Sequence, residues 1–381
     1  MQRRYPYEFD PKKRKRAEQY RRGKLHLYGI GLLVSLATLL SVLVSGLHLV
    51  IRDVSLHTPF PALANGLLVL AVLTVAQLPV TFYSTYVYEH AFHLSRYTLA
   101  RWARDFLKFT LVQYAFALAM IGLLYASFGM FSPWWAYAGV AFLFLSGLMS
   151  YVFPVIVLPF LWKTEPYADE AMKRKLLRLC RKLGVTGIQN VVVIRESEKS
   201  VKPNAVFAGF GTTKQIGLYD TLLTAFTRDE IETVIGHELG HCVNKDIARS
   251  LLLEALLIFP LLFIIDRGVA LFGPAFGVAA ISDGASLALI ALLYGSLNFM
   301  LMPITNSYSR HREAHADAFA LEHVRKPLAQ ISAEKRLADM HLAELEAHPL
   351  TELWLLSHPP TIKRIRMAEE WEERRKKRIY S

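Results

Sequence analysis

One short stretch of the chain has residue types and a spacing that suit metal chemistry. His237 and His241 stand four residues apart in the sequence His-Glu-Leu-Gly-His. On a helix this spacing places both imidazoles on one face, about 40° apart, so that both can reach one ion. Glu238 would lie beside the ion, where its carboxylate can take a proton from a bound water. The stretch therefore predicts a zinc site with His237 and His241 as ligands and Glu238 as the base.

A catalytic zinc ion has three protein ligands and one open position, so a third ligand must come from elsewhere in the chain. Some zinc enzymes use a histidine six residues after the second one, but here that residue is Ile247. Glu254 would lie roughly 20 Å from His241 if one straight helix carries both. We therefore assign the third ligand to Glu313, and we expect Asp317, one helical turn later, to accept a hydrogen bond from a ligand histidine.

Two alternatives stay open for this second stretch. Its two carboxylates can form a solvated acidic face that pairs with nearby arginines, or a nearby histidine can be the third ligand instead of Glu313. The residues concerned are Arg310, Arg312, His311 and His315. His315 points about 200° away from Glu313 on a helix, which disfavours a site that contains both.

The segment around the first motif alternates helix and strand signals. Thr227 and Glu230 form a capping box that starts the helix of the two histidines. The other expected elements are a helix over 169–183, a strand over 190–196, and a hairpin whose strands, 205–210 and 214–219, flank Gly211-Thr212-Thr213. These elements predict a small α+β domain around the metal site.

Much of the remaining chain is too apolar for a soluble protein. The 381 residues are 53% hydrophobic and 20% charged, and residues 109–162 hold no Asp, Glu, Lys or Arg over 54 positions. A helix needs about 20 apolar residues to cross a bilayer. Six segments qualify, since the long run splits near Pro133. The expected spans are 25–51, 62–87, 109–128, 134–160, 251–272 and 285–307.

Basic residues lie on one side of these six spans. Of the 44 Lys and Arg, 42 fall in the segments 1–24, 85–108, 163–249 and 309–381. The positive-inside rule places these segments, both termini and the zinc site on the cytoplasmic side, and we expect the plasma membrane. Two spans separate the two motifs, so both reach the same side. The basic ends are expected to contact the lipid bilayer, not nucleic acid.

With these motifs in place, the chain resembles the type I CAAX prenyl protease family, which are integral-membrane zinc metalloendopeptidases of the gluzincin type related to bacterial heat-shock membrane proteases. Separate motifs in the family's order carry the resemblance. They are 80–107 with Tyr83, Glu89 and Thr98, 154–160, Asn204-Ala205, the zinc helix, 309–320, and Ser357-His358-Pro359-Pro360 followed by Arg364.

The resemblance implies His237, His241 and Glu313 as the ligands of one zinc ion and Glu238 as the catalytic base. It implies that Asn204-Ala205 belongs to an edge strand that holds the substrate backbone. It also implies that His358 and Arg364 steady the tetrahedral intermediate and the substrate. In the resembling family the spans enclose a hollow chamber, and Glu254 would line it or lie at a helix end near the interface.

We therefore expect a mainly α fold, a polytopic membrane helical bundle with a cytosolic α+β zinc metallopeptidase domain. The expected parts are a basic cytosolic tail (1–24), four membrane helices (25–162), a cytosolic segment with the zinc helix (163–249), two membrane helices (250–308) and a cytosolic C-terminal segment (309–381). The expected function is hydrolysis of peptide bonds in a peptide or membrane-protein substrate, lipidated or not. The alternatives are a quality-control protease of the same chemistry, a membrane chaperone with an inactive zinc site, and a transporter.

Overall fold

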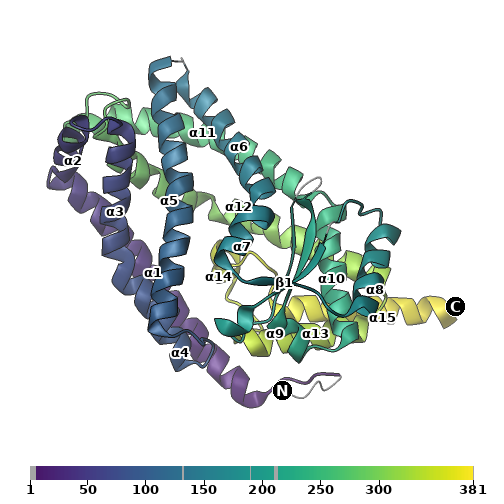
Figure 1. Cartoon of the computed structure of the whole chain (residues 1–381). Coiled ribbons are helices and arrows are strands. Elements are labelled where there is room, and N and C mark those ends of the chain that lie inside the picture. Colours follow the sequence, from purple (N-terminus) through teal and green to yellow (C-terminus); the bar gives the residue numbers. More distant parts are fainter. Residues whose placement is uncertain (1–5, 131–132, 189, 210–212, 381) are drawn as a thin grey trace.

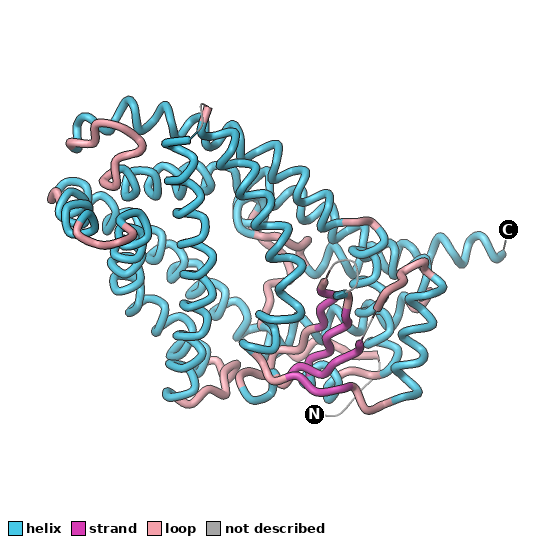
Figure 2. Tube along the Cα trace, turned by 45° about the horizontal axis from the view of Figure 1, so that its top comes forward, coloured by secondary structure: helices cyan, strands magenta, loops and turns pink. Residues whose placement is uncertain are grey.

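The computed structural model describes residues 6–380 except 131–132, 189 and 210–212. Helices make up most of it, and one small sheet lies beside the ends of the long helices (Figures 1 and 2). The α-helices are α1 (Pro11–Val44), α2 (Leu47–Leu56), α3 (Pro61–Phe82), α4 (Tyr88–Ala91), α5 (Leu99–Met130), α6 (Trp134–Val152), α7 (Leu158–Leu161), α8 (Glu170–Lys182), α9 (Asp220–Ala225), α10 (Arg228–Val243), α11 (Asp246–Phe272), α12 (Ser286–Val324), α13 (Pro327–His341), α14 (Pro349–Leu355) and α15 (Thr361–Tyr380). The π-helical turns are η1 (Tyr83–Val87) and η2 (Phe153–Val157), and the 3-10 turns are η3 (Glu196–Glu198) and η5 (Gly273–Phe276).

Six helical stretches of the described chain are long and apolar enough to cross a membrane, which confirms the predicted number of spans. They cover Pro11–Val44, Pro61–Ala91, Leu99–Phe128, Trp134–Leu161, Asp246–Phe276 and Ser286–Val324. Many large apolar side chains are exposed along them, as expected for helices that face lipid. The hollow chamber stays a prediction.

The first span differs from the expected 25–51 at both ends. Asp10 caps α1 by accepting hydrogen bonds from the backbone N–H groups of Lys12 and Lys13, so the helix already starts within the basic tail. At the other end Gly46 adopts a left-handed conformation with φ of 74°, which separates α1 from α2. Hydropathy misses this break because both helices around it are apolar.

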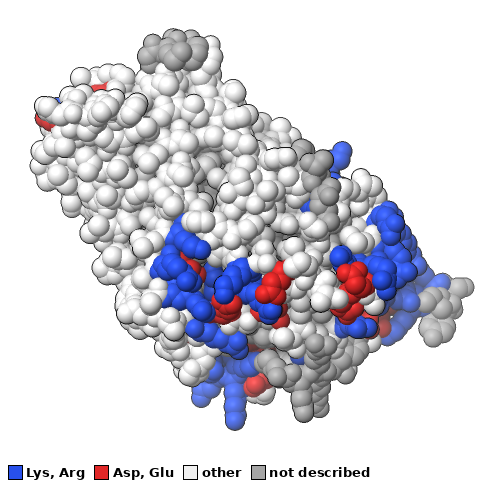
Figure 3. Space-filling model, in the orientation of Figure 1, with Lys and Arg blue, Asp and Glu red and all other residues white. Residues whose placement is uncertain are grey.

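On the face that Figure 3 shows, charged side chains gather in a band across the lower part, while the upper part is almost free of them. Helix α1 begins and helix α15 ends on this charged side (Figure 1). At the opposite end Arg52 of α2 pairs with Asp283 at 3.2 Å. This distribution is the one that the count of basic residues predicted for six spans.

The sheet has four strands in the order β1-β2-β4-β3. They are β1 (Thr164–Pro166), β2 (Asn190–Ile194), β3 (Ala205–Ala208) and β4 (Gln215–Tyr219). Strands β3 and β4 pair antiparallel, which confirms the predicted hairpin, although Phe210, Gly211 and Thr212 of the expected strand end and turn lie outside the described residues. Within the described chain β3 is an edge strand, and its outward N–H groups at Ala205 and Phe207 donate to the side chains of Asn204 and Glu238 instead of to another strand.

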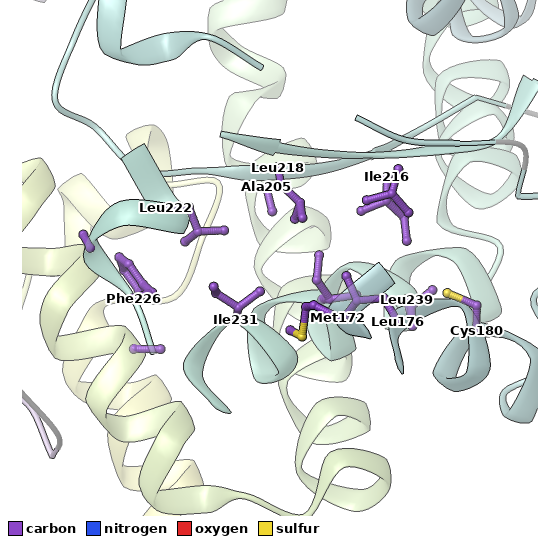
Figure 4. Close-up of a cluster of buried hydrophobic side chains, with 14 of the residues drawn as sticks. Met172, Leu176, Cys180, Ala205, Ile216, Leu218, Leu222, Phe226, Ile231 and Leu239 are labelled. Carbon is purple, nitrogen blue, oxygen red and sulfur yellow. The ribbon is translucent and has the colours of Figure 1, made fainter. Parts of the chain in front are cut away.

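Helices α8 and α10 cover one face of this sheet. Figure 4 shows Ile216 and Leu218 pointing from the strands toward helical side chains such as Leu176 and Leu239, and all four are at most 1% exposed. Residues of α13, including Ala333 and Met340, complete the same core. The two expected cytosolic segments therefore fold together, and we call this unit the sheet domain.

The N-terminal segment packs against the sheet domain. Tyr7 Oη and the backbone N–H of Asp10 donate to Asp339 Oδ2 at 2.8 and 2.7 Å, and Arg14 donates to the carbonyls of Ala338 and Ala343. Asp339 is only 1% exposed, so these contacts satisfy a buried carboxylate. The basic tail, which we expected to contact the lipid bilayer, also packs from Tyr7 onward against the folded protein.

Candidate metal centre

Helix α10 carries the two histidines and begins as predicted. The Thr227 hydroxyl accepts a hydrogen bond from the backbone N–H of Glu230, and the Glu230 carboxylate accepts one from the N–H of Thr227, at 3.3 and 2.7 Å. This reciprocal capping box fixes the start of the helix. Leu239 is fully buried in the core of the sheet domain. His237 and His241 are only partly buried and face α12.

Close contact between α10 and α12 brings the two sequence motifs together. A Cβ atom added to Gly240 would lie 3.0 Å from the Ala316 Cα, and one added to Gly236 would lie 2.5 Å from a Val324 methyl group. Only glycine allows so close an approach without displacing the neighbouring helix. Glu313, one turn before Ala316, consequently meets the histidines across this contact.

Three potential ligand atoms converge at this crossing. His237 Nε2 lies 3.1 Å from His241 Nε2 and 3.2 Å from Glu313 Oε2, and His241 Nε2 lies 3.5 Å from Glu313 Oε1. All the ligand atoms of this group fall within 4.8 Å of one another. Glu313 is 7% exposed, and its Oε2 has no hydrogen-bond partner within the described residues.

Two further carboxylates hold the imidazoles from behind. His237 Nδ1 lies 2.8 Å from Asp317 Oδ1, and His241 Nδ1 lies 2.7 Å from Asp246 Oδ2. Since a carboxylate only accepts hydrogen bonds, each Nδ1 carries a proton, and each Nε2 is the atom that faces the centre. Burial lowers the pKa of His237, but Asp317 and Glu313 outweigh this effect and raise that pKa to about 10, so the surrounding carboxylates favour a positive charge at Nε2, either a proton or a metal ion that replaces it.

This donor set fits a divalent cation. Two imidazole Nε2 atoms and a buried carboxylate face one another, and they need positive charge between them, carried by protons or by a metal cation. Two nitrogen ligands and one oxygen ligand match the His2Glu set of catalytic zinc sites, with imidazoles oriented by carboxylates. The residues present therefore suit zinc.

The sequence did not identify Asp246 as a residue of the centre. Its position also shows that the expected straight helix through His241 and Glu254 was wrong. Helix α10 ends at Val243 and α11 starts at Asp246, because Lys245 adopts a left-handed conformation with φ of 55°. His241 and Glu254 therefore do not share one straight helix, and Glu254 lines a cavity with His241. Asn244, a residue type that favours helix ends, was the available signal for the break.

Glu238 lies between the histidines and the edge of the sheet. Its Oε2 accepts a hydrogen bond from the backbone N–H of Phe207 in β3 at 3.3 Å. Burial raises the pKa of the Glu238 carboxyl above its ordinary value. A carboxylate with a raised pKa next to the outer strand of the sheet is suited to accept a proton from a water and to return it.

The structure brings the other expected site residues to one small cavity beside Glu238. This cavity, of about 120 Å³, is lined by residues that include Asn204, Ala205, His237, His358 and Arg364. They come from the start of β3, from α10, and from the segment that leads into α15 and its first turn. Residues far apart in the sequence thus share a single space.

His358 and Arg364 occupy different positions in that space. His358 Nε2 lies 3.4 Å from Glu313 Oε2, and its side chain is 61% exposed. Arg364 donates from Nη2 and Nε to the two oxygens of Asp317 at 2.6 and 2.7 Å, and its Nη1 lies 2.7 Å from Glu334 Oε2. Arg364 is thus fixed between two buried carboxylates, and sequence reasoning did not identify Glu334.

The histidines and arginines of the two alternatives for the second motif make other contacts in the structure. His311 and His315 are exposed and contact each other, with ring centroids 4.3 Å apart. Arg310 donates to the backbone carbonyls of Glu352 and Leu356. Arg312 donates to the Asp246 carbonyl and the Ser250 hydroxyl, at 3.1 and 2.6 Å. Neither arginine forms an ion pair with Glu313 or Asp317 within the described chain.

Comparison with known proteins places the chain in a family. Residues 166–372 match the model described as peptidase family M48, and residues 4–163 match the model described as "CAAX prenyl protease N-terminal, five membrane helices". The first match alone covers more than half of the chain. The described part of the second region holds four helices that are long and apolar enough to span.

Similar proteins come from bacteria and eukaryotes. The "uncharacterized metalloprotease YhfN" of Bacillus subtilis is 28% identical over 93% of this chain and 85% of its own length. CAAX prenyl protease 1 of Saccharomyces cerevisiae is 26% identical over 80% of this chain and 71% of its own. Protease HtpX of Vibrio atlanticus is 35% identical over 38% of this chain and 54% of its own length.

The fold matches a solved structure as well. The crystal structure of S. mikatae Ste24p superposes with a TM-score of 0.84 at 23% sequence identity, covering 94% of this chain and 89% of that one. The likeness shows a shared fold for the helical bundle and the sheet domain together. The family match, the relatives and the membrane-spanning helices agree: the chain belongs to peptidase family M48 and is a multi-pass membrane metallopeptidase.

Proposed function

We propose that this protein is a zinc endopeptidase in which His237, His241 and Glu313 hold one zinc ion. The observation that carries the proposal is the convergence of their three acceptor atoms, with both imidazoles oriented by carboxylates. A zinc ion bound there would polarise the scissile carbonyl and lower the pKa of a water. Asp317 and Asp246 fix the tautomers that leave both Nε2 atoms available.

Glu238 acts as the base of the reaction. It takes a proton from the attacking water and delivers that proton to the leaving amine. Its burial favours the protonated form that the second step requires. The contact with the Phe207 N–H keeps the carboxylate beside the strand edge where a peptide would bind.

The outer edge of β3 binds the substrate backbone, which replaces the side-chain acceptors of the Ala205 and Phe207 N–H groups. The Phe207 N–H points toward Glu238 and away from β4, so Ala205, two residues earlier, presents its backbone groups on the same side. A peptide added antiparallel to β3 would form main-chain hydrogen bonds there, so recognition depends on an extended backbone more than on one sequence. Asn204 lies at the start of this edge and lines the cavity beside Glu238.

His358 and Arg364 support the reaction in two ways. The exposed His358 ring, which lies near Glu313, can donate to the oxygen that becomes negative in the transition state. Arg364 positions Asp317, and through it His237, because its guanidinium forms ion pairs with Asp317 and Glu334. It also lines the small cavity beside Glu238 and so helps to hold the substrate there. His358 thus stabilises the oxyanion, and Arg364 is a positioning residue.

Peptides or membrane proteins with an accessible extended segment are the proposed substrates. Relatives named CAAX prenyl protease support processing near the C-terminus of lipidated peptides. The local similarity to protease HtpX supports membrane-protein quality control as the second candidate. We place the zinc site, the N-terminus and the C-terminus on the cytoplasmic face of the plasma membrane, following the distribution of basic residues.

A cleavage assay on the purified protein tests the proposal. Prenylated and unprenylated versions of one peptide are compared with an unfolded membrane protein, before and after chelation and after zinc is restored. We expect cleavage that chelation abolishes and zinc restores. Preference for the prenylated peptide supports C-terminal processing, and preference for the unfolded protein supports quality control. Cleavage that persists in zinc-free protein would contradict the proposed centre.

A further inference from the structure

A second cavity adjoins the metal centre on the side of the membrane helices. Its volume is about 350 Å³, which lies within the usual range of 300–1,000 Å³ for ligand pockets. Glu238 and His241 form one wall, and Ser146 and Ser150 of α6 form another. The cavity therefore begins at the catalytic base and extends toward α6 and α11.

The charged groups that face this cavity are almost all engaged. His241 and Glu313 belong to the metal centre, and Asp246 holds His241 through its Nδ1. Arg312 donates to the Asp246 carbonyl and the Ser250 hydroxyl, and its guanidinium lies over the Tyr308 ring. The carboxylate of Glu254 is the exception, because no charged group pairs with it within the described residues.

Glu254 has an incomplete set of partners. Its Oε2 is buried and has no hydrogen-bond partner within the described residues, and the Ser146 side chain lines the same cavity. No Lys, Arg or His nitrogen of the described chain lies within 4.0 Å of it, Arg312 included. A carboxylate at a membrane helix is costly unless it meets a cation or donors, so this one is suited to a group supplied from outside the protein.

The edge strand connects this cavity to the smaller one. Asn204 and Ala205 at the start of β3 line the small cavity, and Phe207 further along the strand lines the large one. Glu238 lines both, so the scissile bond would lie between them. On a peptide antiparallel to β3, which is the more stable pairing, the residues beside Phe207 precede the scissile bond.

We propose that the larger cavity is a specificity subsite in which Glu254 binds a basic side chain, Lys or Arg, of a substrate residue on the amino-terminal side of the scissile bond. The proposal rests on the proposed peptidase function. The subsite combines a cavity of sufficient size, a carboxylate without a cationic partner, and a strand edge that directs preceding residues into it. Ser146 and Ser150 provide further polar groups for the same side chain.

A peptide series on the full-length, zinc-loaded protein tests this subsite. One unlipidated parent peptide carries Lys, Gln or Glu at each of the three positions before the scissile bond, and at the three positions after it as a control. We expect kcat/KM for Lys to exceed that for Glu by at least about tenfold at one preceding position, since a partly desolvated ion pair is strong. E254Q should reduce this ratio to about two or less.

Two other variants complete the design. E254K should reverse the order, so that the Glu peptide becomes the better substrate at the same position. E322Q, which removes an exposed carboxylate near the end of α12, should leave the Lys-to-Glu ratio unchanged. An unchanged ratio in E254Q, or a preference confined to positions after the scissile bond, overturns the proposal.

Binding measurements separate this inference from the proposed function. E238Q should bind the same peptides without cleaving them, so the affinities for the Lys and Glu peptides can be compared in E238Q and in the double variant E238Q/E254Q. A preference for Lys that disappears in the double variant supports the subsite, even if the wild-type protein cleaves none of the peptides. Equal affinities for the Lys and Glu peptides in E238Q contradict the subsite, whatever the wild-type activity.

Discussion

Glu238 differs from the other carboxylates of the centre in what it touches. Glu313 faces both Nε2 atoms, and Asp317 and Asp246 each face an Nδ1 atom, whereas Glu238 contacts the Phe207 N–H of the substrate edge. One carboxylate thus faces the proposed ion, two orient its ligands, and one remains for proton transfer. The four acids have separable functions, so single substitutions can distinguish them.

The substitution Glu238→Gln removes the proposed base and preserves the shape of the side chain. We expect zinc to stay bound at wild-type stoichiometry while kcat falls by about 10²–10⁴-fold, the usual contribution of general acid–base catalysis. Metal analysis and a peptide cleavage assay measure the two effects. E322Q serves as the control. A Gln variant that cleaves at the native rate would falsify the assignment of Glu238.

The substitution Asp246→Asn tests the carboxylate that the sequence did not reveal. Without its charge the hydrogen bond to His241 Nδ1 weakens, and His241 becomes a poorer ligand. We expect zinc affinity, measured by competition with a chelator, to fall about 10–100-fold. Asp229→Asn changes an exposed acid of α10 and should have no effect. An unchanged affinity for D246N would show that Asp246 does not orient the ligand.

At the scale of elements, the contact between α10 and α12 sets the geometry of the centre. Gly240→Ala places a methyl group 3.0 Å from the Ala316 backbone, so the two helices must separate. We expect a loss of about 1–3 kcal/mol in the free energy of unfolding, the usual effect of overpacking, together with weaker zinc binding. Thermal unfolding and metal competition measure both.

Gly295→Ala is the matched control for that substitution. Gly295 lies on α12, and a Cβ added there meets nothing within 4 Å. Because alanine favours helix more than glycine, this variant should keep or slightly raise stability. If G240A binds zinc as tightly as G295A, close packing at Gly240 is not what brings Glu313 to the histidines.

Elements with strong local signals were predictable, and those that depend on tertiary contacts were not. The six spans follow from about 20 apolar residues each, and α10 follows from the capping box at Thr227. Gly46 and Lys245 adopt a left-handed conformation and separate two helices each. The hydrophobic pattern of the sequence continues across both positions, so it does not predict these breaks. Asp246 was missed for the same reason, since its position depends on that second break.

At the scale of the whole molecule, a buried ionic cluster joins the membrane helices to the sheet domain. Glu89 of α4 lies 2.8 Å from Lys24 Nζ of α1 and 2.8 Å from Lys202 Nζ, and it accepts a hydrogen bond from Tyr20 Oη at 2.7 Å. Lys202 lies just before β3, so the cluster fixes the approach to the substrate edge. Sequence patterns do not reveal it, because its members come from three distant segments.

Replacing Glu89 by Ala tests this connection. Tyr20 and both lysines lose their buried partner, and we expect the free energy of unfolding to fall by about 3 kcal/mol, the low end for a broken buried pair, because the lysines remain 29% exposed and can reach water. A shifted β3 edge should raise KM for peptides more than it lowers kcat. Glu18→Ala, an exposed change on α1, is the control. Loss of stability with an unchanged KM would mean that the cluster joins the two halves of the molecule without positioning the substrate edge.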